Sequence, residues 1–158
     1  MKKQKGFTLI ELLVVIAILG ILSTLAVVSL QNAREKGRDA KRISDIRQIQ
    51  TALELYMNDS TGYPETTGDI TLGEDAVALT NNGFVASTGD TDTVFYMRQV
   101  PKAQEPADGG CGDANDYIYT SQDDGASYTI SFCLGGQTGS LTAGVNTATP
   151  GGIISSAE

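Results

Sequence analysis

The chain contains no histidine and only two cysteines among its 158 residues. Without histidine there is no serine–histidine triad, no zinc site of the usual histidine and cysteine kind, and no histidine-ligated haem. No candidate nucleophile stands in a recognisable activating setting either. We therefore expect a protein that is not an enzyme, and an extracellular hydrolase is the least favoured alternative.

Basic residues are scarce beyond Arg47. Residues 1–47 hold nine basic and four acidic residues, a net charge of +5, and the whole chain carries −8, so residues 48–158 carry −13. A body of this charge repels phosphate backbones. General nucleic-acid binding is therefore not expected, and the length favours one domain.

Charged side chains are absent from Leu12 to Ala33. As a helix, these 22 residues span roughly 33 Å, close to the ~30 Å hydrocarbon core of a bilayer. The stretch from Leu12 to Leu19 is apolar on every face, unlike a surface helix. The sequence thus predicts a membrane-spanning helix.

A secretory signal peptide is the alternative, since the leader is basic and Ser23 or Ala26 offers a cleavage site. The apolar segment is longer than such peptides need, and they gain nothing from an acidic residue such as Glu11. Glu11 either stays solvated among the lipid headgroups or has a cationic partner. A cut after Gly6 would create such a cation, the α-amino group of Phe7, which can pair with a carboxylate of another subunit.

The run Lys5-Gly6-Phe7-Thr8-Leu9-Ile10-Glu11 and the apolar helix after it resemble the type IV pilin and type II secretion pseudopilin family. The resemblance implies that a prepilin peptidase cuts between Gly6 and Phe7 and methylates Phe7. It implies that Glu11 neutralises the N-terminal amine of an adjacent subunit during assembly. The leader would be cytoplasmic, the helix a single pass through the inner membrane, and the head extracytoplasmic, ending in a periplasmic or extracellular filament. Expected partners are further copies of the chain, minor pilins or pseudopilins, the peptidase, the inner-membrane assembly platform and membrane lipid.

One residue departs from the family pattern. Many members have proline at the twenty-second mature position, where this chain has Val28. Gly20, Ser23 and Thr24 still allow local weakening of the helix, because glycine costs about 1 kcal/mol in a helix and hydroxyls compete for backbone carbonyls.

Beyond the membrane segment, apolar residues recur at helical spacing, at Ile43, Ile46, Ile49, Leu53 and Tyr56. We expect one helix from Phe7 to Met57 and an α+β fold in which it packs on a small antiparallel β-sheet head, as in pilins. The predicted parts are a leader (1–6), a transmembrane and polymerisation helix (7–33), an amphipathic stalk (34–58) and a loop-rich head (59–158). We assign the mixed charges of residues 34–42 to a solvated helix face, with contact to headgroups or acidic neighbouring subunits as the alternative.

Within the head, residues 117–120 and 127–134 read as an antiparallel hairpin. Residues 141–145 offer a third strand, and the tail from Asn146 reads as irregular or loosely attached. Residues 65–110 give weak signals only, a short helical turn over 74–79 and a strand over 93–97.

Cys111 and Cys133 enclose 23 residues, and in an extracytoplasmic head a disulfide between them would stabilise by roughly 3 kcal/mol. Two unrelated reduced cysteines are the alternative, but the resemblance favours the bridge, since many pilins close a C-terminal loop this way. Major pseudopilins bind calcium in their C-terminal loops, which makes five carboxylates calcium candidates: Asp108, Asp113, Asp116, Asp123 and Asp124. Because no EF-hand spacing is present, a solvated acidic loop without cofactor is the favoured reading.

The function that fits these features is that of a structural filament subunit. The segment Gly62-Tyr63-Pro64 after the stalk favours a secretion pseudopilin, whereas the cysteine pair favours a pilin. The alternative is a signal-anchored binding or adhesion module that does not polymerise. Such an anchor has no use for Glu11.

Overall fold

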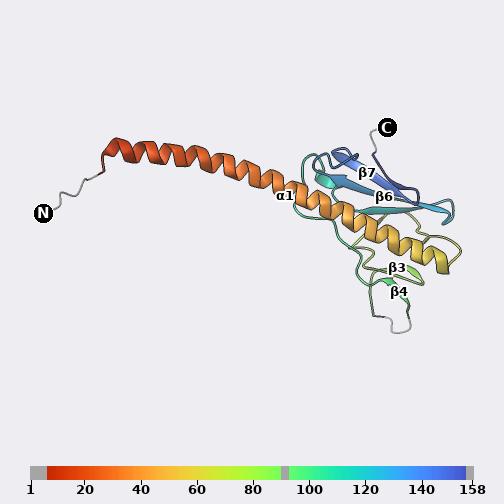
Figure 1. Cartoon of the computed structure of the whole chain (residues 1–158). Helices are drawn as coiled ribbons and strands as arrows, with labels where there is room; N and C mark the ends of the chain where they lie inside the picture. Colours follow the sequence, from red (N-terminus) through yellow and green to blue (C-terminus); the bar gives the residue numbers. More distant parts are fainter. Residues whose placement is uncertain (1–6, 90–92, 156–158) are drawn as a thin grey trace. The chain divides into compact units, whose positions relative to one another are not determined.

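The computed structural model describes residues 7–89 and 93–155 (Figure 1). Helix α1 (Leu9–Asp59) comes first, two residues later at each end than expected, and short strands and one 3-10 turn, η1 (Gly112–Ala114), follow it. The chain divides into two compact units, Met1–Arg34 and Glu35–Glu158. The boundary lies inside α1, so each unit contains one part of that helix.

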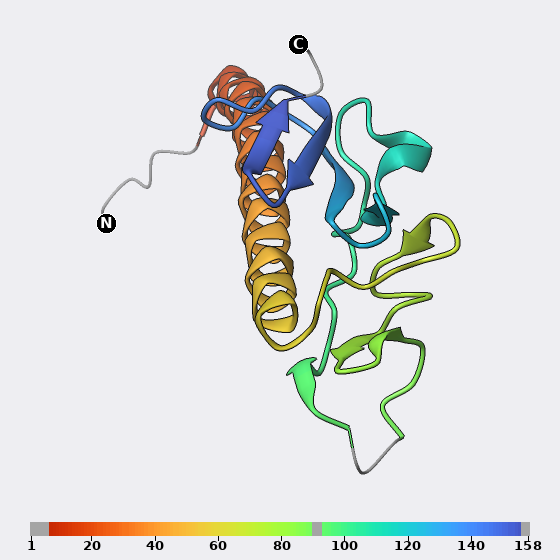
Figure 2. The same ribbon diagram turned by 90° about the vertical axis from the view of Figure 1, so that its right-hand side faces the viewer.

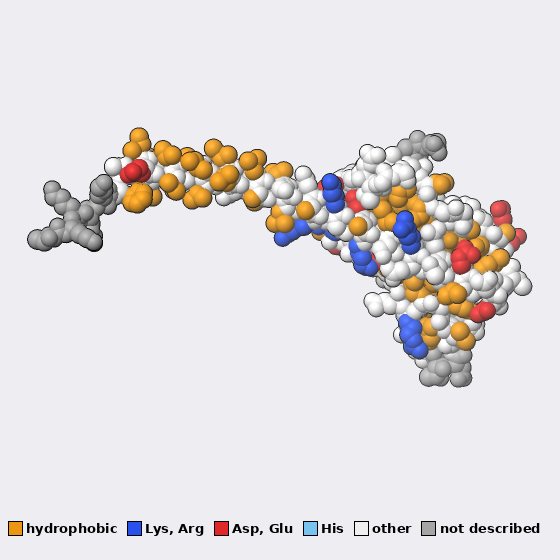
Figure 3. All heavy atoms as spheres, in the orientation of Figure 1, with side chains coloured by type: hydrophobic (Ala, Val, Ile, Leu, Met, Phe, Trp, Pro, Cys, Tyr) orange, Lys and Arg blue, Asp and Glu red, His pale blue; other side chains and the backbone are white. Residues whose placement is uncertain are grey.

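In the first unit, α1 is regular and uncovered. Every described residue from Phe7 to Arg34 is exposed, and apolar side chains cover the visible face of this part of the helix (Figure 3). The helix continues without a break through Gly20 and Val28. The Thr24 hydroxyl donates to the Ile21 carbonyl at 2.8 Å, which satisfies the hydroxyl within the helix.

The second unit contains a five-stranded antiparallel sheet in the order β1-β5-β6-β7-β8. Its strands are β1 (Ile70–Thr71), β5 (Ile118–Gln122), β6 (Ser127–Leu134), β7 (Gly144–Thr149) and β8 (Gly152–Ser155). The predicted hairpin is confirmed as β5 and β6. Asp123 and Asp124 turn the chain between them with φ of 50° and 51°, a region that aspartate tolerates better than most residues.

A smaller antiparallel sheet has the order β3-β2-β4. Its strands are β2 (Ala78–Thr80), β3 (Gly83–Val85) and β4 (Phe95–Met97). This sheet and the C-terminal strands lie on opposite sides of the second part of α1 in Figure 1, and they are again well separated in Figure 2. The surface of the head beside the smaller sheet and the surface beside the C-terminal strands are therefore made by different segments of the chain.

Two sequence predictions for the head are wrong. The tail from Asn146 is not loose, because it completes β7 and forms β8, and the side chains of Asn146 and Ala148 are fully buried. Residues 74–79 form no helix: they make a turn that leads into β2. In both places pairing with another segment decides the structure: β7 pairs with β6, and the Val77 N–H donates to the Val85 carbonyl.

The core joins the amphipathic part of α1 to the larger sheet. Ile46, Ile49 and Leu53 are buried and contact a cluster contributed largely by β5 and β6, which includes Tyr119, Tyr128, Ile130, Phe132 and Leu134. Burial of each large apolar side chain stabilises by about 1.5–3 kcal/mol. The predicted stripe of α1 is thus the face on which the head is built.

Candidate functional site

At the start of α1, Thr8 and Glu11 bond to each other. The Glu11 carboxylate accepts the backbone N–H of Thr8 at 2.8 Å and the Thr8 hydroxyl at 2.7 Å. The Thr8 hydroxyl also accepts the Glu11 N–H at 3.4 Å. This reciprocal arrangement is a capping box, in which two N–H groups that the helix leaves unpaired find side-chain oxygens.

The capping box fixes Glu11 at the N-terminal end of the apolar helix. Both described bonds to its carboxylate end on Oε2, and a carboxylate has room for more donors than these. Phe7 is 84% exposed and stands immediately before Thr8. A cation from another molecule can therefore approach Glu11 while the cap stays intact. Gly6, the other predicted processing residue, lies outside the described residues.

The apolar part of α1 has the length and composition to cross a membrane, and none of its most apolar window is buried within the chain. It is the one such helix among the described residues. A helix that is apolar all round needs lipid or other apolar helices around it. The residues that the structure describes supply neither.

A second group of charged residues joins α1 to the loop before β5, and sequence reasoning missed it. This Arg42 cluster consists of Arg38, Asp39, Arg42, Asp108 and Asn115. The Arg42 guanidinium is fully buried and donates to Asp39 and Asp108, both at 2.9 Å, and to the Asn115 side-chain oxygen at 3.1 Å. It also donates to the Gln104 carbonyl at 2.9 Å.

Arg38 and Asp39, which also belong to the Arg42 cluster, add further bonds between α1 and the head. Arg38 forms a two-pronged ion pair with Asp108, in which Nε donates to Oδ2 at 2.6 Å. These bonds from Arg38 hold the pKa of the Asp108 carboxyl below its usual value. Asp39 accepts the backbone N–H groups of Gly135 and Gly136, each at 2.9 Å. The expectation of a solvated face is therefore wrong for Asp39 and Arg42.

Cys111 and Cys133 form the predicted disulfide, with Cα atoms 5.6 Å apart. The bridge ties the loop that carries Asp108 to strand β6, and the Arg42 cluster ties the same loop to α1. A Cβ added to Gly135 would collide with the Asp108 side chain, so glycine is required where this loop crosses the end of β6. Helix, loop and sheet are thus fastened at one place.

The structure does not gather the calcium candidates. Asp108 is occupied by Arg38 and Arg42, Asp123 and Asp124 lie in the β5–β6 turn, and Asp116 lies before β5. The side chain of Asp113 is outside the described part of the chain. Among the described residues, no group of three or more His, Cys, Asp or Glu side chains is placed to hold a metal ion.

Comparison with known proteins gives matches of limited extent. Residues 1–27 match the family model described as the prokaryotic N-terminal methylation motif. The chain is 45% identical over 64 residues to the type II secretion system core protein G of Pectobacterium carotovorum subsp. carotovorum, covering 40% of this chain and 41% of that protein.

Two further relatives with the same name match the chain to a similar extent. That of Escherichia coli (strain K12) is 45% identical over 64 residues, or 40% of this chain and 44% of the relative. That of Vibrio cholerae serotype O1 is 44% identical over 66 residues, or 42% and 45%. The matches thus span less than half the length of these relatives. No solved structure matches the chain.

Three observations now coincide: a methylation motif at the N-terminus, relatives that are type II secretion core proteins G, and one long N-terminal helix packed on antiparallel sheets. The N-terminal part of the chain is therefore similar to that of type II secretion core proteins G, and these findings support the type IV pilin and type II secretion pseudopilin family.

Proposed function

We propose that this chain is the structural subunit of a helical filament that is assembled from the inner membrane. A prepilin peptidase cuts between Gly6 and Phe7 and methylates the new amine, after which the helix from Phe7 holds the subunit in the membrane until assembly. The head faces the periplasm, and the filament grows there or beyond. Other copies, minor pseudopilins, the assembly platform and lipid are its partners.

The observation that supports this proposal best is the uncovered first part of α1. A segment whose every described side chain is exposed, and whose composition is apolar, needs a cover from outside the chain. Lipid serves before assembly, and the equivalent helices of other subunits serve after it. Glu11, held at the start of this helix by Thr8, then pairs with the Phe7 amine of a neighbour and sets the axial register.

The secretion pseudopilus is the favoured form of the filament, because the relatives are named as type II secretion core proteins G and Gly62-Tyr63-Pro64 follows α1. A pilus is the second form, supported by the disulfide between Cys111 and Cys133. Coexpression with each assembly system and microscopy of the cells distinguishes the two. A surface pilus made only with the pilus system would overturn the secretion assignment.

The test of polymerisation is the substitution Glu11→Val, with Glu105→Gln as matched control because Glu105 is an exposed carboxylate of the head. Both variants and the wild type are produced in cells that contain the assembly system, and sheared filaments are quantified. We expect Glu11→Val to enter the membrane but give almost no filaments, and Glu105→Gln to behave as wild type. Normal filaments from Glu11→Val would contradict the role of Glu11. A wild-type chain that never polymerises would instead support the monomeric binding module.

A further inference from the structure

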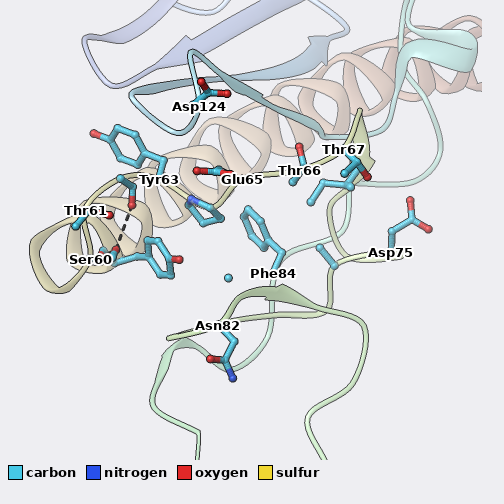
Figure 4. A pocket seen from close by; sticks show the side chains of 16 residues that line it. Ser60, Thr61, Tyr63, Glu65, Thr66, Thr67, Asp75, Asn82, Phe84 and Asp124 are labelled. Atoms are coloured by element: carbon cyan, nitrogen blue, oxygen red, sulfur yellow. Dashed lines mark hydrogen bonds between the residues drawn. The ribbon is translucent and has the colours of Figure 1, made fainter.

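The head contains a cavity of about 540 Å³ at the C-terminal end of α1 (Figure 4). Its walls come from that end of the helix, the loop after it, the β2–β3 turn and the β5–β6 turn. The residues used below are Tyr56, Glu65, Asp75, Phe84 and Asp124. Figure 4 shows the Phe84 ring and the Glu65 carboxylate near the middle of the cavity, with Asp124 coming from the β5–β6 turn.

The cavity combines negative charge with aromatic surface. Three carboxylates line it, from Glu65, Asp75 and Asp124, and no lysine or arginine does. None of the three is in an ion pair within the described residues, although Asp75 accepts the Thr71 N–H at 3.0 Å. Tyr56 and Phe84 add aromatic side chains to the lining. A planar cation fits such a lining, because guanidinium groups pair with carboxylates and stack on rings.

Most cations of the same head already have partners. Ion pairs join Lys41 to Asp45 and Lys102 to Glu74, and they hold Arg38 and Arg42 in the Arg42 cluster. Arg98 lies over the Phe95 ring, 4.5 Å from its centroid. Within the described part of the second unit, Lys36 and Arg47 are the cations left without an ion pair or a ring contact, and both are exposed.

Of these two residues, Arg47 is the better candidate to bind in the acidic cavity of another molecule. It lies beside a groove of about 430 Å³ between α1 and the β7–β8 turn, and this groove shares no lining residue with the acidic cavity. Tyr56, the helix residue of the cavity, is nine residues further along, about 13 Å by helix rise. Lys36 follows the apolar segment by only three residues, where long cations extend into lipid headgroups.

We propose that the acidic cavity receives the Arg47 guanidinium of a second copy of this chain. The proposal rests on the proposed filament function and adds a contact between heads to the packing of the N-terminal helices. The two contact surfaces are different patches: the cavity is lined by the β2–β3 and β5–β6 turns, and the groove beside Arg47 is lined by the β7–β8 turn. A contact between unlike patches repeats from copy to copy, and it generates an open helical polymer when its rotation does not close into a ring.

The test is a charge exchange in the full-length chain, produced with its assembly system. Arg47→Glu and Glu65→Arg are made singly and together, and Lys36→Glu is the matched control. We expect each single reversal to lower the yield of sheared filaments by about tenfold or more, since like charges at an interface cost several kcal/mol. The double variant should recover most of the wild-type yield, and Lys36→Glu should keep it. Formation of the Cys111–Cys133 bridge verifies that each head has folded.

A cross-link gives the second readout. A chain carrying Arg47→Cys and Glu65→Cys should form a ladder of disulfide-linked multimers under oxidation, and a chain carrying Arg47→Cys and Thr88→Cys, which is exposed outside the cavity, should not. Filaments that form normally in both single reversals, or that form with no ladder, overturn this contact while the filament function stands. Absence of filaments from the wild-type chain overturns the function, and this contact with it.

Discussion

Helix α1 is one continuous element whose two parts are covered in opposite ways. From Phe7 to Arg34 every described residue is exposed, although most of the side chains are apolar. From Glu35 to Asp59, seven residues are buried by the head, and three of them are charged: Asp39, Arg42 and Asp45. The apolar part is thus left exposed by the described part of the chain, while seven residues of the polar part are buried within the head. Composition alone would assign these the other way round, because charged residues normally face water.

The broadest test of this contrast is a chain that starts at Glu35. If the second part of α1 is stabilised within the head, residues 35–158 should be soluble, monomeric and folded, with the Cys111–Cys133 bridge formed. The full chain should need detergent. Size-exclusion chromatography and circular dichroism of both chains provide the measurement. An insoluble or unfolded fragment would show that the head depends on the apolar segment.

Within the head, Arg42→Met should have the largest effect on stability. Methionine fills the space but leaves Asp39 and Asp108 buried without the guanidinium, and loss of one partner of a buried pair costs about 3–5 kcal/mol. Arg47→Met, at an exposed position on the same helix, should stay within about 0.5 kcal/mol of wild type. Urea unfolding of both variants measures the difference. Equal stability of the two would mean that the Arg42 cluster does not hold the head on α1.

Removal of the disulfide should come next in size. The double substitution Cys111→Ser and Cys133→Ser removes the cross-link that closes a 23-residue loop, so the unfolded chain gains conformational entropy. The free energy of unfolding should therefore fall by about 3 kcal/mol. Because Asp108 holds the same loop on α1, the reduced head should still fold. Urea unfolding with and without reductant provides the measurement. A head that unfolds completely on reduction would show that the Arg42 cluster cannot hold this loop alone.

The smallest predicted effect is the loss of stability of the head at low pH. Arg38 and Arg42 hold the pKa of Asp108 below its usual value, so its contribution to stability is present above the unfolded-state pKa of about 4 and is lost as pH falls through the lower folded-state pKa. The urea midpoint should therefore change little between neutral pH and about pH 5, and fall at lower pH. Asp108→Asn should flatten this fall and lower stability at pH 7, whereas Asp123→Asn, in an exposed turn, should not. An unchanged acid limb in Asp108→Asn would assign the effect to other carboxylates.

Much of the fold could be predicted because several single segments carry a regular pattern of apolar residues. The uncharged run from Leu12 to Ala33, the stripe from Ile43 to Tyr56 and the alternation in β6 each reveal their burial without knowledge of a partner. The predicted third strand over 141–145 overlaps only the first two residues of β7, and β8 was missed because it is four residues long and shows no regular alternation. Their pairing with β6 becomes evident only in three dimensions.

The disulfide, the helix cap and the Arg42 cluster could also be predicted only where the sequence carries a local pattern. The Cys111–Cys133 bridge was predicted, and the Thr8 to Glu11 cap was readable from its spacing of three residues but was overlooked. The Arg42 cluster was not readable at all. Its partners lie up to 97 residues away, and a run of mixed charges looks the same whether water or a buried carboxylate faces it.

The most direct test of the filament assignment is the intact mass of the full-length chain recovered from membranes of cells that contain a prepilin peptidase. We expect the mass of residues 7–158 with one added methyl group. Alkylation of Cys111 and Cys133 should follow only after reduction. A full-length mass would contradict processing and leave a plain membrane anchor. A chain cut after Ser23 or Ala26 would be a secreted head, and the filament assignment would fail.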